Sequence, residues 1–194
     1  MLTDDKSITT AGYWAKVYNG ESHGKVDNSN TKRPKNYFDR FQWLANQVEG
    51  PYVLDVASGH AVTCKRIKAM HPDWEVIASD QTPAAMNVTD YRPYIQLNAY
   101  ALTLFFQKHS AHDSKFTTIT ISQALEYLDH PNEFMRQARQ IAHYFVCTVP
   151  EGEMEKWSQL RIYEEHSFKG WLREFGNIEH FDKVPGLMLA KIKF

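Results

Sequence analysis

Acidic, glycine and amide residues stand where the apolar runs of this chain end. The run YVLDVASGHAV, Tyr52 to Val62, is typical of a buried strand that passes through a tight turn into a helix. Such a turn leaves backbone N–H groups at the start of the helix free to bind a carboxylate or a phosphate. Asp80 ends the next apolar run, where a carboxylate can accept both hydroxyl groups of a ribose. Asp55, Gly59 and Asp80 therefore predict a site for a nucleotide-like ligand.

Two later strand ends add candidates to the same site. The third apolar run ends in Asn98 and Ala99, where a side-chain amide can pair with the edge of an adenine. The fourth ends in Ser122 and Gln123. In open α/β sheets, ligands bind beyond the carboxyl ends of the strands, so these residues are expected along one edge.

The elements that must position these residues alternate along the chain. Strands are predicted at 52–57, 74–80, 93–99, 116–122 and 143–149, with helices at 61–70, 99–109 and 130–142 and a short one after Pro83. A late helix at 167–175 precedes two strands about the turn Pro185–Gly186. This order predicts a doubly wound α/β sheet.

Two helices are expected before the first strand. Residues 11–18 form a short aromatic segment, and the pattern from Pro34 places Phe38, Phe41, Leu44 and Val48 on one helical face. The polar stretch between these two helices is a loop.

Composition limits the function classes. The chain has 194 residues, enough for one domain with a sizeable core, with 43% hydrophobic and 23% charged residues. The net charge of −1 provides no field to recruit nucleic acid or an anionic membrane. The basic clusters at 31–35 and 64–68 are interpreted as a solvated loop and a solvated helix face.

The cysteines and the N-terminus predict a reducing compartment. Cys64 and Cys147 belong to no CxxC pattern and are expected to be reduced, partly buried thiols. The segment MLTDDKSITT has no apolar core and is not a signal peptide, and no apolar run is long enough for a membrane span. A cytoplasmic location is therefore expected.

From residue 36 to 194 the chain resembles a class I S-adenosylmethionine-dependent methyltransferase. VLDVASGHA resembles the family's D-x-G-x-G-x-G loop, VIASDQTPAAM its acidic second strand end, and QLNAYAL its adenine-contacting segment. ISQALEYLDHPNEFMRQARQI, FVCTVPEGE and EEHSFKGWLREFGNIE resemble its fourth strand with the following helix, its fifth strand and its late helix.

The resemblance implies a fold, a cofactor and residue roles. The fold is a Rossmann-like sheet, mostly parallel with an antiparallel last strand, with helices on both faces in a single domain of residues 1–194. S-adenosylmethionine is the implied cofactor. Its amino-acid end would lie against Asp55, Ala57, Ser58 and Gly59, and its ribose against Asp80. Its adenine would lie against Gln81, Thr82, Asn98 and Ala99. Its methionine arm would lie against Ser122, with Gln123 close by. Asp80 as a surface acid and Asn98 as a turn residue remain alternatives.

The loop departs from the family pattern at two glycines. Ala57 and Ala61 replace the first and third glycine, and Gly59 retains the second. A positive φ at Ala57 would cost about 1–2 kcal/mol, whereas Ala61 is expected to begin the helix, where alanine is favourable. The loop is interpreted as functional; the alternative is a catalytically silent module that binds a partner.

Other enzyme classes fit less well. A nicotinamide dehydrogenase expects G-x-G-x-x-G, and this loop has only Gly59. A zinc site lacks a third ligand near His109 and His112, so no metal is expected.

The methyl acceptor is expected to be a small molecule or a group on a protein surface, not nucleic acid and not a membrane component. A general base matters only if the acceptor atom must lose a proton. Four residues are candidates for that base: Glu126, Tyr127, His130 and His166. Residues 1–33, which carry Tyr13, Trp14 and Tyr18, are expected to form a lid or part of the acceptor site beside a cofactor-binding core of 34–194.

Overall fold

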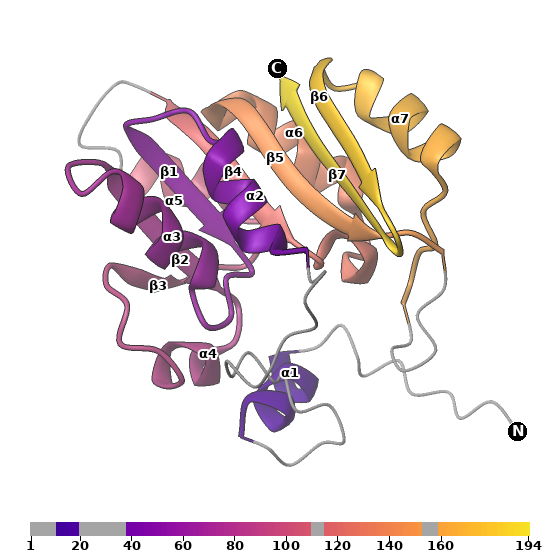
Figure 1. The fold of residues 1–194 in the computed structure, drawn as a ribbon. Coiled ribbons are helices and arrows are strands. Elements are labelled where there is room, and N and C mark those ends of the chain that lie inside the picture. The colour runs from indigo at the N-terminus through magenta and orange to yellow at the C-terminus, as the bar shows by residue number, and fades with distance from the viewer. Residues whose placement is uncertain (1–10, 20–37, 110–114, 153–158) are drawn as a thin grey trace, which may run out of the picture.

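A computed structural model describes residues 11–19, 38–109, 115–152 and 159–194. Within these residues seven strands form one sheet in the order β3-β2-β1-β4-β5-β7-β6 (Figure 1). The strands are β1 Tyr52–Val56, β2 Glu75–Asp80, β3 Tyr94–Gln96, β4 Phe116–Ser122, β5 Ala142–Pro150, β6 Asn177–Val184 and β7 Leu187–Lys193. Strands β1 to β5 are parallel, and β7 runs antiparallel to both of its neighbours. The predicted doubly wound sheet with an antiparallel last strand is confirmed.

Helices cover both faces of this sheet. They are α1 Ala11–Tyr18, α2 Arg40–Gln47, α3 Val62–Met70, α4 Pro83–Asn87, α5 Leu102–His109, α6 Pro131–Ile141 and α7 Glu165–Arg173, with a 3-10 helix η1 at Leu125–Tyr127. Successive residues of β1 point to opposite faces: Val53 belongs to the core cluster that includes α2 and α3, and Leu54 to the cluster on the other face that includes α5, α6 and α7. Because both faces are covered, residues on both faces of the central strands are buried, including Thr118 and Thr120 of β4, which alternate with Ile119 and Ile121.

Helix α2 begins later than its apolar pattern predicts. Residues 34–37 lie outside the described part of the chain, and the helix starts at Arg40. Asp39 is its N-cap, and its Oδ1 accepts hydrogen bonds from the backbone N–H groups of Phe41 (3.2 Å) and Gln42 (3.1 Å). An aspartate cap of this kind stabilises a helix by about 0.5–2 kcal/mol. The cap fixes the start of α2 and therefore the position of Arg40.

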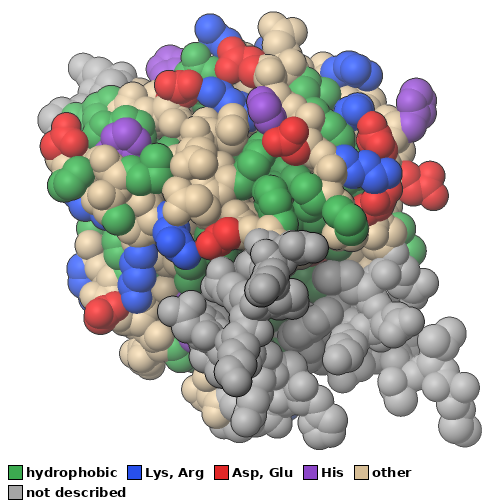
Figure 2. Space-filling view, viewed as in Figure 1, with side chains coloured by type: hydrophobic (Ala, Val, Ile, Leu, Met, Phe, Trp, Pro, Cys, Tyr) green, Lys and Arg blue, Asp and Glu red, His purple; other side chains and the backbone are tan. Residues whose placement is uncertain are grey.

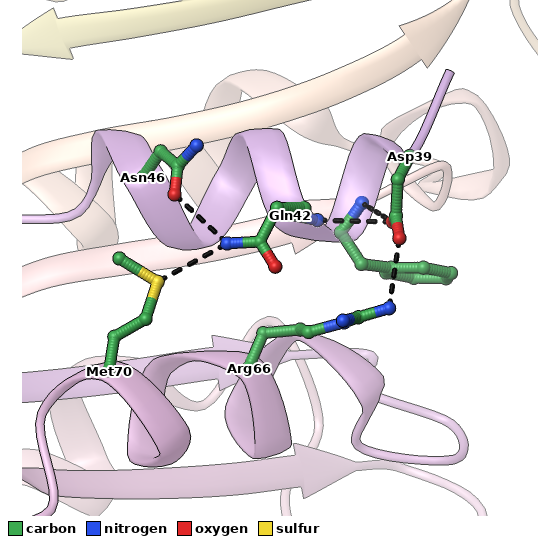
Figure 3. Close-up of polar contacts among 6 residues, drawn as sticks. Asp39, Gln42, Asn46, Arg66 and Met70 are labelled. Carbon is green, nitrogen blue, oxygen red and sulfur yellow. Dashed lines mark hydrogen bonds and ion pairs between the residues drawn. The ribbon is translucent and has the colours of Figure 1, made fainter. Parts of the chain in front are cut away.

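The same cap joins α2 to α3 (Figure 3). The second carboxylate oxygen of Asp39 pairs with Nη2 of Arg66 at 2.9 Å. One turn further along, the side-chain amide of Gln42 donates to Oδ1 of Asn46 (3.0 Å) and to the sulfur of Met70 (3.3 Å). Helix α2 is thus held against the helix that follows the candidate loop.

The two cysteines, the helix lengths and the surface charges bear on where the protein is found. Cys64 and Cys147 are free thiols, as predicted, but they are completely buried because both lie between the sheet and its covering helices. Among the described helices, none is long and apolar enough to cross a membrane. On the face that Figure 2 shows, acidic and basic side chains of the described residues are interspersed.

Candidate functional site

The carboxyl ends of β1, β2 and β4 lie side by side at one edge of the sheet. Val56, the last residue of β1, pairs with Ser79 of β2 on one side and Ile121 of β4 on the other. The loop after β1 therefore lies between Asp80 and Ser122, the residues that end the two neighbouring strands. The structure brings the first, second and fourth predicted strand ends together.

Every second residue of this loop has a left-handed backbone. The φ angles are 55° at Ala57, 53° at Gly59 and 55° at Ala61. Ala57 does take a positive φ, the condition under which strain was expected there. The prediction that Ala61 begins the helix is wrong: Ala61 is the N-cap in the left-handed region, and α3 begins at Val62. Each alanine in this region costs about 1–2 kcal/mol, so both glycine replacements carry backbone strain.

Restoring the two glycines should stabilise the protein. Ala57→Gly together with Ala61→Gly removes this strain but increases the entropy of the unfolded chain, so the expected net gain is up to about 1 kcal/mol per site. Thermal unfolding should show a Tm higher by about 2–4 °C per kcal/mol. As a control, Ala138→Gly inside α6 should lower the Tm. A double variant with a lower Tm than wild type would contradict the strain at these positions.

Asp55 and Ser58 brace the loop with their side chains. Ser58 Oγ donates to the carbonyl of Asp55 (2.7 Å) and accepts from the N–H of Ser79 (3.1 Å). The Asp55 carboxylate is buried and accepts from the hydroxyl of Thr120 at 2.6 Å. Burial raises the pKa of Asp55 to about 6. Both side chains thus serve the shape of the loop, and their direct contact with a ligand stays a prediction.

Asp80 faces this loop from the end of β2. Its side chain is buried, the residue being 5% exposed, so it is no exposed strand-end acid. Oδ2 accepts from the N–H of Gly59 (3.2 Å) and Oδ1 from the N–H of Thr82 (2.9 Å). Burial raises the pKa of Asp80. A buried carboxylate therefore stands against the backbone of the one glycine that the loop retains.

The predicted adenine-side residues are arranged less specifically. The carbonyl of Gln81 accepts from Nε2 of Gln96 (3.2 Å). Asn98 is exposed, and its Oδ1 accepts from the N–H of Tyr100 (2.8 Å). Ala99 is half-buried against the core. Asn98 thus stabilises the turn before α5, in agreement with its alternative interpretation.

Ser122 ends β4 among polar side chains from other elements, and the sequence did not predict these contacts. Its Oγ accepts from Nε of Arg40 (3.3 Å) and lies 3.1 Å from Oγ1 of Thr148. Gln123 follows with a positive φ of 49°. Arg40 comes from α2, so only the packing of that helix reveals it.

Two tyrosines complete the surroundings of Gly59. The hydroxyl of Tyr94, in β3, donates to the carbonyl of Gly59 at 2.9 Å. The hydroxyl of Tyr18, in α1, donates weakly to Oδ2 of Asp80 at 3.5 Å, and a Cβ added to Gly59 would lie 2.8 Å from it. Tyr18 belongs to the predicted lid segment. Tyr94 could not be identified as a site residue from the sequence, because its contact with Gly59 depends on the pairing of β2 with β3.

Helix α1 lies across this edge of the sheet (Figure 1). At one end Tyr18 meets Asp80, and one turn earlier Trp14 contacts the ring of Tyr127 edge-on, with centroids 5.4 Å apart. The side chain of Tyr13 lies outside the described residues. The helix therefore connects the end of β2 with η1, which follows β4; that residues 1–33 act as a lid stays a prediction.

The four candidate bases have different surroundings. Glu126 and Tyr127 are buried in η1, while His130 and His166 are exposed. In the part of the chain that the structure describes, no three His, Cys, Asp or Glu side chains cluster in a way that could hold a metal ion.

Comparison with known proteins identifies the fold. No protein-family model and no curated protein sequence matches the chain. The [4+2]-cyclase SpnF has a similar structure, with a TM-score of 0.61 and 12% identity over 79% of this chain and 78% of the cyclase. The glycopeptide N-methyltransferase MtfA in complex with S-adenosylmethionine gives a TM-score of 0.56 and 12% identity, covering 78% and 84%.

A third structure matches nearly the whole chain. This protein, solved in work on the conversion of a disulfide bond into a thioacetal group during echinomycin biosynthesis, has a TM-score of 0.68 and 14% identity, covering 95% of this chain and 92% of its own. At these identities the likeness shows the fold, which is that of the class I S-adenosylmethionine-dependent methyltransferases.

Proposed function

We propose that this protein binds S-adenosylmethionine and transfers its methyl group to an acceptor. The observation that carries the proposal is the buried Asp80 carboxylate at the end of β2, within 3.2 Å of the N–H of Gly59 in a left-handed loop. A carboxylate at this position of a doubly wound sheet suits a ribose, and the adjoining backbone suits a carboxylate at the start of α3.

The residues present fit this cofactor. Asp80 would hold the ribose hydroxyls, the N–H groups between Ala57 and Gly59 would hold the amino-acid end, and Ser122 would line the methionine arm. When bound, the cofactor supplies a methyl group on a sulfonium, which is already an activated leaving group. The protein then has to align the acceptor and exclude water.

Calorimetry with S-adenosylhomocysteine tests the proposal directly. We expect one site per chain with a dissociation constant in the range of about 1 μM to 1 mM that is usual for enzyme substrates. NAD serves as a control because it also carries ribose but is expected to require the G-x-G-x-x-G loop that this chain lacks. Absence of heat and of any thermal shift at millimolar S-adenosylhomocysteine would contradict the proposal.

A catalytically silent binding module is the second candidate function. It is favoured by the backbone strain at Ala57 and Ala61 in the candidate cofactor loop. Cofactor binding without methyl transfer to any acceptor would favour this candidate.

Tyr18 should compete with the cofactor for Asp80. The Tyr18 hydroxyl donates a hydrogen bond to Oδ2 of Asp80, and a bound ribose hydroxyl would need to donate to the same oxygen. Tyr18→Phe should therefore raise the affinity for S-adenosylhomocysteine by about 2- to 10-fold, which corresponds to one hydrogen bond of about 0.5–1.5 kcal/mol. Tyr91→Phe is the control, because its hydroxyl bonds to the carbonyl of Val76 inside the fold. A weaker affinity in Tyr18→Phe would mean that the tyrosine binds the cofactor.

We further propose a small molecule or a protein-surface group as the acceptor, and a cytoplasmic location. The net charge of −1 and the interspersed surface charges support an acceptor other than nucleic acid. The two buried free cysteines fit a reducing compartment.

A further inference from the structure

Glu126 is a completely buried carboxyl group whose oxygens have no hydrogen-bond partner among the described residues. Its exposed fraction is 0%, and neither carboxylate oxygen bonds to a described residue. Burial raises its pKa to about 8. A buried polar group of this kind destabilises a folded protein, and it is rare unless a ligand or the chemistry of a site requires it.

Two further polar atoms near Glu126 also lack partners among the described residues. They are Nε of Arg161 and the hydroxyl of Tyr163, both buried. The N–H groups of Leu160 (3.0 Å) and Arg161 (3.2 Å) donate to the carbonyl of Glu126, which fixes this segment to η1. Burial raises the pKa of Tyr163, the charge of Arg161 lowers it, and the charge of Glu126 raises it further. A carboxyl, an N–H donor and a hydroxyl thus form one polar cluster.

The cluster lies beside the part of the site assigned to the methionine arm. Glu126 follows Ser122 by one short turn after β4. Arg40 donates to Ser122, and its positive charge counteracts the effect of burial on the pKa of Glu126. The group assigned to the cofactor and the unpartnered carboxyl therefore share Arg40 as a neighbour.

Apolar side chains adjoin this polar cluster. Tyr127, next to Glu126, packs against Trp14 of α1. Beside Arg161, Leu160 and Ile162 are 46% and 55% exposed although both are large and apolar. Such side chains suit the apolar body of a small ligand whose polar group enters the cluster.

We infer that Glu126 is the catalytic base for a hydroxyl or amine acceptor carried on an apolar molecule, with Arg161 and Tyr163 binding the same polar group. The inference rests on the proposed function. In the reaction, the acceptor heteroatom forms its new bond to the methyl carbon with its own lone pair. Its proton passes to a carboxylate oxygen of Glu126, and the electron pair of the broken carbon–sulfur bond stays on sulfur. A carboxylate acceptor has no proton to lose and would be repelled by ionised Glu126.

The first test uses the ligand-free protein. Glu126→Gln keeps the shape of the side chain but cannot ionise, and Glu133→Gln is the control because Glu133 is exposed on α6. Below the ordinary glutamate pKa both states of the protein hold the Glu126 proton. Between that value and about 8, ionisation stabilises only the unfolded state. The Tm of Glu126→Gln minus that of wild type should therefore be near zero at about pH 4, below the ordinary glutamate pKa, and increase toward pH 8. A difference that stays constant, or a Tm below wild type at pH 8, would contradict a buried unpartnered carboxyl.

The titration also involves the groups that face Glu126. These are Arg40 from α2, Cys147 from β5, and Arg161 and Tyr163 from the segment before α7. Burial raises the pKa of Cys147 and of Tyr163, so both stay neutral over this range. Among the acidic groups of this cluster, Glu126 is therefore the one that changes charge between pH 4 and pH 8.

The second test uses phenol, benzylamine and benzoate as probes on protein saturated with S-adenosylhomocysteine. The ¹³C carboxyl resonance of Glu126, assigned through Glu126→Gln, should shift with phenol or with benzylamine and not with benzoate. A shift with phenol alone indicates a hydroxyl acceptor, and one with benzylamine alone an amine. A shift with benzoate, or with none of the three, would overturn the inference.

The third test is methyl transfer from S-adenosylmethionine to whichever probe shifts the resonance. Glu126→Gln should lower the rate by about 100-fold or more, the usual effect of losing a general base, with unchanged S-adenosylhomocysteine affinity. The wild-type rate should rise with pH up to about 8, and the residual rate of the variant should not. Full transfer by Glu126→Gln would overturn the inference. If wild type binds no S-adenosylhomocysteine, the proposed function fails, and the ligand-free test still reports on Glu126.

Discussion

Gly59→Val should abolish measurable binding of S-adenosylhomocysteine, with an affinity loss of more than about 100-fold. The φ of Gly59 is 53°, a conformation that a β-branched residue adopts only under strain. A Cβ at this position would also lie 2.8 Å from the hydroxyl of Tyr18 and would cover the backbone next to Asp80. Calorimetry on the folded variant measures the loss.

A second glycine separates the binding effect from backbone strain. Gly186, in the turn between β6 and β7, has a φ of 75° and nothing within 4 Å of an added Cβ. Gly186→Val should therefore lose stability through strain, as Gly59→Val does, while it keeps the affinity of wild type. Normal binding by Gly59→Val would mean that the cofactor lies elsewhere.

Much of the fold follows from the chain's periodicity. Apolar runs predict β1, β2 and β5, β-branched residues predict β4, and the order of these strands allows few topologies. Boundaries follow from capping. Asp39 delays the start of α2, and the left-handed Ala61 delays that of α3, although alanine alone favours a helix.

Site residues that end a predicted strand could be identified from the sequence. Those that reach the site from another element, through tertiary packing, could not. Gly59 and Asp80 could be predicted from strand ends, and in the structure the backbone nitrogen of Gly59 lies 3.2 Å from Oδ2 of Asp80. Tyr94 and Arg40 reach the site from other elements, and local sequence carries no sign of that contact. Glu126 was one of four candidate bases, and what distinguishes it is burial without a hydrogen-bond partner among the described residues. Burial and pairing are tertiary properties, so residue type could not rank these candidates.

Helix α1 links the two halves of the proposed site. Tyr18 meets Asp80 on the side assigned to the ribose, and Trp14 meets Tyr127 beside Glu126. A change in the position of α1 would therefore affect cofactor and acceptor together. For this reason, single substitutions at Tyr18, Asp80 and Glu126 are more informative than removal of the whole N-terminal segment.

Asp80→Ala should weaken S-adenosylhomocysteine binding by about 10- to 100-fold, since hydrogen bonds to a charged acceptor contribute about 1.5–3 kcal/mol. Asp80 also accepts from Gly59 and Thr82, so alanine would loosen the loop as well. Asp80→Asn keeps a carbonyl acceptor without the charge and should lose less affinity than alanine.

The charge of Asp80 can be separated from its shape by pH. Because burial raises the pKa of Asp80, protonation at low pH removes the same charge that Asp80→Asn removes. The ratio of dissociation constants between Asp80→Asn and wild type should thus shrink as pH falls, provided the protein stays folded. Asp90→Asn is the control, because Asp90 is exposed and pairs with Lys65 on the surface. An unchanged dissociation constant in Asp80→Ala would place the ribose elsewhere, whereas a ratio that does not vary with pH would mean that hydrogen-bond geometry, not charge, determines the affinity.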